Sequence, residues 1–521
     1  DMTQVYLLTV DRVSNPVLNG IEGETRSYNG TDYTYTGISD VEIVQNDDGT
    51  VDYNITLRDD IVFSDGTPMT IDDVIFSMYV LSDPTYDGSS TFYAVPIEGM
   101  EEYRSGMDLL LNLIVAAGPD NTDFTNWTEE QQTALWDAFW KGGEKFAQEI
   151  VDYCVDNGYA EAGDVAGAAA AWNYPDLAAD ATAADFFQAM VDAYGYDISD
   201  AGINLETAGT SISDFILAEL GDKAAEYQAG VATGSTVPNI SGIVKTGDYS
   251  MTVRTTRYDA AAIYQLGVTV APLHYYGDVS KYDYENNMFG FTKGDLSTVR
   301  DKTTQPLGAG PYKFVSYANG VVTFEANENY WKGQPKTQYV LFQETAASDK
   351  LSGVASDAAT FDITDPNFNV DTVEDIKGYN SNGELTGDKL TTFTIDNLGY
   401  GYIAMCANNV CIDGDPASDA SKNLRKGFAT LFAVYRDTVV NSYYGETASI
   451  IQYPISNTSW AAPRPADEGY ETAFSVDVDG NPIYTDDMTE QERYDAALQA
   501  AIGFFKAAGL NWDEASGKFV A

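Results

Sequence analysis

The chain has 521 residues, 44% of them apolar, which is enough for a sizeable core and about three domains of ordinary size. It carries 28 Lys and Arg against 80 Asp and Glu, a formal charge of −52. Such a chain lacks the basic face that binding to nucleic-acid phosphates or to anionic lipid requires. One histidine and three cysteines nearly exclude a structural zinc site, which needs four such ligands, and a disulfide framework is equally disfavoured at this size. No run of 18 apolar residues predicts a membrane span.

Residues 1–100 predict a mixed α/β body. The runs 41–44 and 51–57 flank an Asp48-Gly49 turn, and the second run alternates apolar and polar residues, which is typical of a hairpin with one wet face. Thr70 followed by Asp73 predicts a capping box at the start of a helix. The apolar stripe expected on that helix is Val74, Ile75, Met78 and Leu81.

Residues 101–236 differ in composition, because alanine and acidic residues replace β-branched alternation. Thr128 and Gln131 predict the capped start of a helix. We interpret this stretch as a helical insertion into a larger lobe, and a free-standing helical domain remains the alternative. The apolar face expected on its first helix is Leu135, Trp136, Phe139 and Trp140.

Strand patterns return in residues 237–345. The runs 312–317 and 321–324 flank Asn319-Gly320, which is a strong hairpin signal. Residues 346–521 predict strands mixed with two long helices. The second of these begins at a capping box formed by Thr489 and Glu492 and stops near Gly509. The apolar face expected on the first is Leu424, Phe428, Leu431, Phe432, Tyr435 and Val439.

Four blocks in this order carry a family resemblance. They are LRDDIVFSDGTPMTIDDV at 57–74, APLH at 271–274, PLGAGPYKF at 306–314 with NENYWKGQP at 327–335, and NLRKGFAT at 423–430 followed by YYG at 443–445. Together they resemble the family 5 extracellular solute-binding proteins, the peptide- and nickel-binding receptors of ABC importers. The resemblance covers residues 1–100 and 237–460, and the stretch 101–236 is longer and more helical than is usual there.

The resemblance implies a two-lobed α/β fold of the periplasmic-binding-protein type (type II) that closes on a ligand held between its lobes. Lobe I would comprise residues 1–100 and 237–310, with the helical insertion at 101–236, and lobe II would comprise residues 311–521. Family members usually end with a further segment that returns to lobe I, and in peptide receptors it carries the acidic partner of the ligand's α-amino group. We expect the sequence to be truncated before that segment.

Five residues are candidate ligand contacts. Asn408 and Asn409 follow a predicted strand at 400–405 that contains Tyr402, where the family often has a crossover asparagine; the alternative is that they hold a turn. Trp460, on a loop, could form a pocket wall or merely pack on the surface. Arg464 could bind a ligand carboxylate through its fork, although a surface ion pair is favoured.

No catalytic residue, metal site or cofactor is predicted. His274 has no nucleophile elbow beside it, so a structural role is favoured. Cys406 and Cys411 are not in C-x-x-C spacing, which favours small buried apolar residues over a redox pair. The motif Gly308-Ala309-Gly310-Pro311 lacks the pattern of a phosphate loop.

The expected function is therefore the substrate-binding component of an ABC importer, which captures an extracellular solute, an oligopeptide first of all, and delivers it to permease subunits. We expect an extracytoplasmic monomer whose targeting segment and lipid anchor are not in this sequence. The alternatives are the same fold binding an oligosaccharide or a metal chelate and, less favoured, a carboxylate-based hydrolase.

Overall fold

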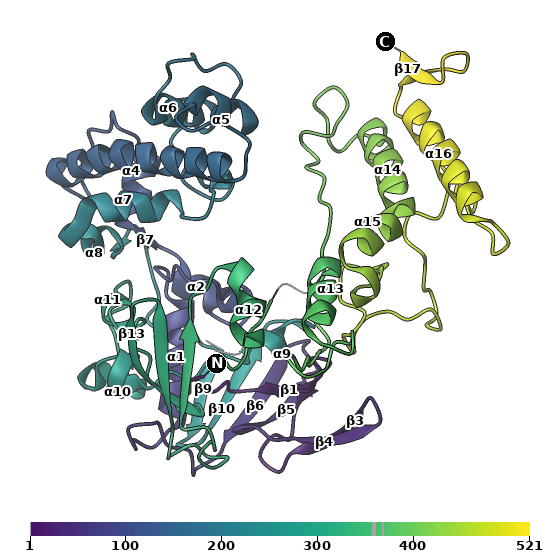
Figure 1. Ribbon diagram of the computed structural model, residues 1–521. Coiled ribbons are helices and arrows are strands. Elements are labelled where there is room, and N and C mark those ends of the chain that lie inside the picture. The colour runs from purple at the N-terminus through teal and green to yellow at the C-terminus, as the bar shows by residue number, and fades with distance from the viewer. Residues whose placement is uncertain (1, 357–360, 367–368, 521) are drawn as a thin grey trace. The chain divides into compact units, whose positions relative to one another are not determined.

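The computed structural model describes residues 2–356, 361–366 and 369–520 (Figure 1). The chain divides into two compact units. Unit 1 contains the residues up to Thr9 and Pro16–Phe342, and unit 2 contains Val10–Asn15 and the residues from Gln343 onward. The two units divide between Phe342 and Gln343. The lobe boundary expected from the family resemblance lies between residues 310 and 311, so the lobe assignments remain predictions.

The centre of unit 1 is a four-stranded antiparallel sheet in the order β5-β6-β10-β9. Its strands are Ser39–Gln45, Val51–Leu57, Ser250–Thr255 and Ile243–Gly247 respectively. Alternate side chains of β6 are buried, from Val51 to Leu57, because strand side chains point to opposite faces. The predicted hairpin at 41–57 is confirmed, since Val41 lies opposite Ile55 in the β5–β6 register.

Helix α1 (Ile71–Ser82) packs its apolar stripe into the same core as this sheet. Val74, Ile75 and Met78 are fully buried there. The predicted capping box is present, because the hydroxyl of Thr70 accepts a backbone N–H of the first turn and the Asp73 carboxylate accepts the N–H of Thr70.

The second core of unit 1 belongs to a body of helices α3–α8 (Figure 1). Its longest helix, α4 (Glu129–Asp156), begins at the predicted Thr128–Gln131 capping box and has 28 residues. Helices α6 and α7 pack against α4. The largest buried side chains in this core include Phe139, Phe146 and Phe187. The helices of this body are α3 Leu110–Ala117, α4 Glu129–Asp156, α5 Val165–Ala171, α6 Ala183–Tyr194, α7 Ile212–Leu220 and α8 Ala224–Tyr227.

Lys293 joins segments that flank this helical body. Its ammonium group donates to the carbonyl of Tyr103 at 2.5 Å, to the hydroxyl of Thr236 and to the carbonyl of Val237 at 3.0 Å. Burial lowers the pKa of Lys293, while these oxygens keep its charge satisfied.

The remaining elements of unit 1 are short. The hairpin β13–β14 turns at Asn319 and Gly320, both with positive φ, which confirms the predicted Asn-Gly turn. The strands not yet named are β1 Thr9–Val10, β2 Pro16–Val17, β3 Glu24–Tyr28, β4 Thr31–Tyr35, β7 Met107–Leu109, β8 Gly230–Ala232, β11 Tyr282–Asp283, β12 Met288–Phe289, β13 Tyr312–Ala318, β14 Val321–Ala326 and β15 Tyr339–Gln343. The helices not yet named are α2 Met100–Arg104, α9 Ala262–Gln265, α10 Leu273–Tyr276 and α11 Ser297–Arg300.

Unit 2 is built around the helix pair α14 and α16 (Figure 1). Phe428 of α14 meets Phe505 of α16 edge to face at 5.0 Å, and Gly427 leaves room for the Phe505 ring. The predicted Thr489–Glu492 capping box opens α16. The elements of this unit are α12 Lys350–Ala355, α13 Val370–Tyr379, α14 Asp419–Val434, α15 Arg436–Tyr443, α16 Glu490–Ala507, β16 Asn511–Asp513 and β17 Lys518–Val520.

Two predictions for unit 2 are wrong. Residues 400–405 form no strand, and within the described residues after Gln343 strands appear only at β16 and β17. The helix with the predicted face ends at Val434, and Phe432, Tyr435 and Val439 are 43–61% exposed rather than buried. A strand needs a partner edge, and residues 400–405 pair with none in the described part of the chain.

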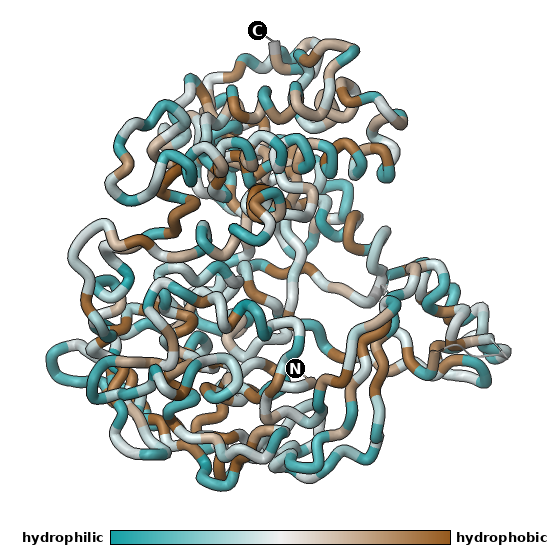
Figure 2. The backbone as a smooth tube through the Cα atoms, turned by 90° about the vertical axis from the view of Figure 1, so that its left-hand side faces the viewer, coloured by the Kyte–Doolittle hydropathy of each residue, from teal (hydrophilic) through white to brown (hydrophobic). Residues whose placement is uncertain are grey.

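Hydrophobic residues are spread along the chain. Figure 2 shows hydrophobic and hydrophilic positions interleaved along the tube in the described parts of the molecule. Among the described residues, no helix combines the length and the apolar character needed to cross a membrane.

Candidate functional site

Three of the four sequence blocks that carry the family resemblance meet in unit 1. The N–H of Ser64 donates to the carbonyl of Gly308 at 2.9 Å, and the amide of Asn329 donates to the carbonyl of Ser64 at 3.3 Å. Arg58 lies over the ring of Trp331 at 5.1 Å. These contacts hold loops against one another, so the blocks serve the framework of unit 1.

The Gly308–Gly310 loop packs directly on the N-terminal segment. Gly310 donates to the carbonyl of Thr3 at 3.0 Å, and a Cβ on Gly310 would lie 2.5 Å from a backbone atom of Thr3. The buried side chain of Asn327 donates to the carbonyl of Gly310 at 2.8 Å. Close backbone approach therefore accounts for the glycine at this position.

His274 has a carboxylate partner. Its Nε2 lies 2.7 Å from Oδ2 of Asp65, and its ring lies 5.7 Å from that of Phe63. Burial by itself would raise the pKa of Asp65. The hydrogen bonds from the N–H of Thr67 and from His274 have the larger combined effect, so the pKa of Asp65 is lowered. A hollow of about 370 Å³ beside His274 is lined by groups of both signs, among them Asp278 and Lys281. The pairing agrees with the structural role expected for His274.

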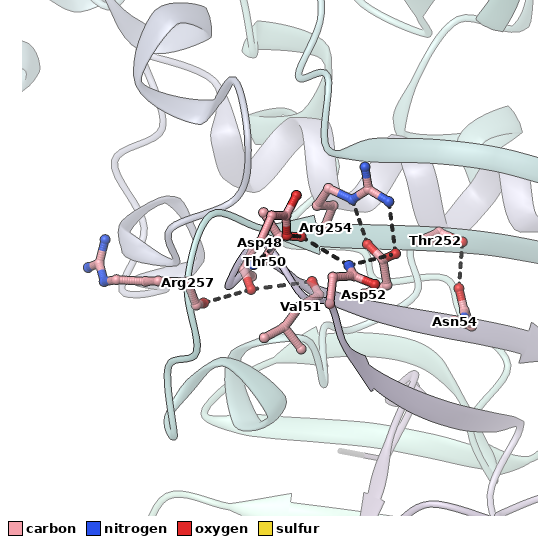
Figure 3. Close-up of polar contacts among 10 residues, drawn as sticks. Asp48, Thr50, Val51, Asp52, Asn54, Thr252, Arg254 and Arg257 are labelled. Atoms are coloured by element: carbon pink, nitrogen blue, oxygen red, sulfur yellow. Dashed lines mark hydrogen bonds and ion pairs between the residues drawn. The ribbon is translucent and has the colours of Figure 1, made fainter.

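A polar cluster lies on β6 and β10 of the central sheet (Figure 3). The guanidinium of Arg254 donates to both carboxylate oxygens of Asp52, at 2.7 and 2.8 Å. Next to this pair, the hydroxyl of Thr252 donates to Asn54 at 2.8 Å. The Arg254 hydrogen bonds lower the pKa of Asp52. Each charge already has its partner, so this cluster joins neighbouring strands.

All five candidate ligand contacts belong to unit 2. Trp460 lies on a loop that holds the Val10–Asn15 segment of the same unit: its backbone N–H donates to the carbonyl of Val13 at 3.0 Å, and its indole N–H to that of Ser14 at 3.2 Å. The residue remains 50% exposed. The indole N–H of Trp460 is thus held by a hydrogen bond, while half of the residue stays accessible to a ligand.

Arg464 lies four residues further along the same loop. Its guanidinium donates to the carbonyl of Asn457 at 2.5 Å and to that of Ser459 at 2.9 Å. Arg464 also lines a hollow of about 270 Å³, together with Tyr453 and Tyr470. The carbonyl contacts fix the orientation of the guanidinium, in place of the surface ion pair that the sequence favoured.

Tyr402 is 79% exposed and lies beside Tyr400, with ring centroids 6.2 Å apart. Asn408 and Asn409 are exposed on a turn in which the carbonyl of Cys406 accepts the N–H of Asn409 at 3.2 Å. The structure gathers Trp460 and Arg464 on one loop and places the two asparagines on a separate turn.

Two features beside the candidates were missed by sequence reasoning. One is the Val10–Asn15 turn, in which the Asp11 carboxylate accepts the N–H groups of Val13 and Asn15 at 3.0 and 2.9 Å. An Asp followed by Ser and Asn is a turn signal that could have indicated it. The other is the Tyr453–Tyr470 pair, whose spacing in sequence carries no signal.

The expectation that both Cys406 and Cys411 are buried is wrong. Cys406 is exposed and Cys411 is half-buried, whereas Cys154 is buried. The turn between Cys406 and Cys411 lies at the surface, so a role as small buried apolar side chains does not explain why cysteines occur at these two positions.

A family model described as bacterial extracellular solute-binding proteins, family 5 Middle, matches residues 41–126 and 179–519. It leaves out residues 127–178, which lie in the helical body. A curated relative, the oligopeptide-binding protein AppA of Bacillus subtilis (strain 168), is 24% identical over 239 residues, which cover 45% of this chain and 38% of the relative. The match therefore spans well under half of that relative's length.

Two solved structures are also similar. The AppA structure from Bacillus subtilis in complex with a nonapeptide is 14% identical, with a TM-score of 0.36, covering 100% of this chain and 60% of that one. The structure of HbpA2 from Haemophilus parasuis is 12% identical, with a TM-score of 0.39, covering 98% and 61%. The expected class, a mixed α/β solute-binding-protein fold, is confirmed by the family match, which covers most of the chain.

Proposed function

We propose that this chain, which belongs to family 5 of the bacterial extracellular solute-binding proteins, is the substrate-binding component of an ABC importer and captures an oligopeptide outside the cytoplasm. The observation that carries the proposal is the family match to residues 41–126 and 179–519. The relative AppA is an oligopeptide-binding protein, which favours peptides as the cargo. The family is a class of receptors and not of enzymes, so the peptide would be released unaltered.

The candidate residues of unit 2 suit the chemistry of a peptide. Asn408 and Asn409 each offer a donor and an acceptor for backbone amide groups. Tyr402 and Trp460 offer apolar area with few rotatable bonds to immobilise. We propose these four residues as ligand contacts.

Arg464 would meet a carboxylate of the peptide. The carbonyls of Asn457 and Ser459 hold its guanidinium at the edge of the hollow that contains Tyr453 and Tyr470. A cation that is already oriented loses less conformational entropy when the ligand binds. A micromolar receptor needs about −8 kcal/mol in total, which a few such contacts along a peptide backbone can supply.

The proposed partners follow from the family. They are the peptide and the permease subunits of an importer. The charge of −52 favours a monomer, because copies of so acidic a chain repel one another.

A thermal-shift screen tests the proposal. The chain would be heated with short peptides, with oligosaccharides and with chelated nickel, each in excess. A ligand at a hundredfold excess over its Kd stabilises the folded state by about 2.7 kcal/mol, so peptides should raise the melting temperature. A shift with oligosaccharides or chelated nickel and none with peptides would contradict the peptide assignment. Hydrolysis of a glycoside would contradict a receptor role.

A further inference from the structure

Cys406 and Cys411 lie at the two ends of one surface turn in unit 2, and both are free thiols. The carbonyl of Cys406 accepts the N–H of Asn409 at 3.2 Å and that of Val410 at 2.9 Å, which folds the chain back between the cysteines. The thiol of Cys411 donates to the carbonyl of Asn408 at 3.0 Å, so its sulfur points back into this turn.

Cys154 is in a different environment. It is buried on α4 in the helical body, where its thiol lies 3.8 Å from the carbonyl of Ala168. Burial raises the pKa of the Cys154 thiol. Because the thiolate is the reactive form, the thiol of Cys154 does not compete with those of Cys406 and Cys411 for a disulfide partner.

We propose that Cys406 and Cys411 form an intramolecular disulfide when the chain meets an oxidising environment. The turn hydrogen bond joins Cys406 to Val410, and Cys411 follows one residue later. A helical rise over these five residues is about 7.5 Å, whereas a disulfide joins Cα atoms about 4.4–6.8 Å apart. The surface turn must therefore tighten for the two sulfurs to meet.

The reaction is thiol–disulfide exchange with an external small-molecule disulfide. One cysteine thiolate attacks a sulfur of that disulfide and displaces one thiol, which leaves a mixed disulfide on the protein. The second cysteine thiolate attacks the protein sulfur of this mixed disulfide and displaces the other thiol. The two protein thiols are oxidised to one disulfide, and the external disulfide is reduced to two thiols.

The bond would tie a loosely held segment to a fixed one. On the Cys411 side, Arg425 of α14 donates to the carbonyl of Val410 at 2.9 Å, and the N–H of Ile412 donates to Ser421 of α14 at 2.8 Å. On the Cys406 side, residues 392–405 form no strand or helix. The disulfide would therefore fasten the end of this extended segment to the start of α14 and close the turn that carries Asn408 and Asn409.

Alkylation and mass spectrometry test the proposal on the native chain. The reduced protein would be incubated with oxidised glutathione, unfolded, treated with N-ethylmaleimide and digested. We expect one alkylated cysteine, Cys154, and a peptide with Cys406 joined to Cys411, its mass lower by two hydrogens. The variants Cys406→Ser and Cys411→Ser should each carry glutathione on the remaining cysteine of the pair.

Three outcomes would overturn the proposal. They are three alkylated cysteines in the oxidised wild type, glutathione on both Cys406 and Cys411 without ring closure, and disulfide-linked dimers. As a second measurement, the wild type should melt at a higher temperature when oxidised than when reduced, and the Cys406→Ser variant should not. Neither measurement uses a cargo, so the result is independent of the proposed peptide binding.

Discussion

Asp73 joins two helices of unit 1 through one buried carboxylate. One oxygen accepts the N–H of Thr70 at 2.9 Å in the capping box, and the other accepts the N–H of Leu273, the first residue of α10, at 2.9 Å. The residue is 6% exposed. Burial raises the pKa of Asp73, and the two N–H donors oppose that rise.

The variant Asp73→Ala should lose about 2 kcal/mol of unfolding free energy, because it removes a cap and leaves a buried N–H without its acceptor. Urea denaturation would measure the loss. Asp59→Ala is the matched control, since it removes an exposed carboxylate from the same sequence block. Equal effects of the two variants would show that the link to α10 contributes nothing.

The Asp52–Arg254 pair predicts a pH dependence. Arg254 lowers the pKa of Asp52, so the pair stabilises the fold above the unfolded-state pKa of about 4 and loses this contribution as the pH falls through the lower folded-state pKa. We expect Asp52→Asn to melt below the wild type at pH 7 and the difference to shrink as the pH drops below 4. Asp47→Asn, in the neighbouring turn, controls for the loss of one surface charge. A difference that is constant between pH 7 and 3 would contradict this role.

Two variants of Trp460 distinguish a role in ligand binding from a role in stability. Trp460→Ala should weaken peptide binding by about tenfold, or 1.4 kcal/mol, through the loss of apolar contact. Trp460→Phe keeps a ring but loses the hydrogen bond to Ser14, so it should retain most of the affinity and lower the melting temperature. Calorimetry would give the Kd of each. Trp140→Ala, in the helical body, is the control, because it also removes a half-exposed indole. If Trp140→Ala and Trp460→Ala bind the peptide with the same Kd, Trp460 is not a ligand contact.

At the scale of elements, two helical glycines differ in the space around them. Gly142 of α4 faces the backbone of α7, where an added Cβ would lie 2.8 Å from the carbonyl carbon of Phe215. Gly378 of α13 has no atom within 4 Å of an added Cβ among the described residues. The first glycine serves close helix packing, and the second only costs backbone entropy.

The two alanine variants should therefore change stability with opposite signs. Gly142→Ala should lose about 1–3 kcal/mol to overpacking, whereas Gly378→Ala should gain about 1 kcal/mol from helix propensity. Chemical denaturation followed by circular dichroism measures both. A stabilising Gly142→Ala would show that α7 can shift away from α4 without loss.

Local chemistry made several elements of this fold predictable. The Asn319-Gly320 hairpin and the capping boxes at Thr70, Thr128 and Thr489 depend on residues a few positions apart, and all appear in the structure. The absence of the predicted strand at 400–405 was not predictable, because a strand forms only where distant residues supply a partner edge. The exposure of Phe432 and Tyr435 likewise depends on what α16 covers.

The site was less accessible to sequence reasoning than the fold. Trp460 and Arg464 were chosen from residue type and loop position, and the contacts of Arg464 with the carbonyls of Asn457 and Ser459 have no sequence pattern. The Val10–Asn15 segment meets Trp460 across more than 440 positions, a separation that no local pattern spans.

At the scale of the whole molecule, the gap in the family match and the helical body have different boundaries. The match omits residues 127–178, which include all of α4 and α5. The strands of the central sheet lie within the matched ranges apart from the first residues of β5. We propose that the helical body is an addition to the family framework, since it has its own core of aromatic side chains. Its helices α4 and α5 lie in the omitted residues, whereas α3 and α6–α8 lie within the matched ranges.

The most direct test of the account is to measure peptide binding and to recover the peptide. The 521-residue chain would be titrated with a set of short peptides by calorimetry, and each peptide would be analysed by mass spectrometry before and after incubation. We predict saturable binding of at least one peptide with a Kd of about micromolar or below, and recovery of that peptide unchanged. Absence of binding across the set, or a peptide recovered in cleaved form, would contradict it.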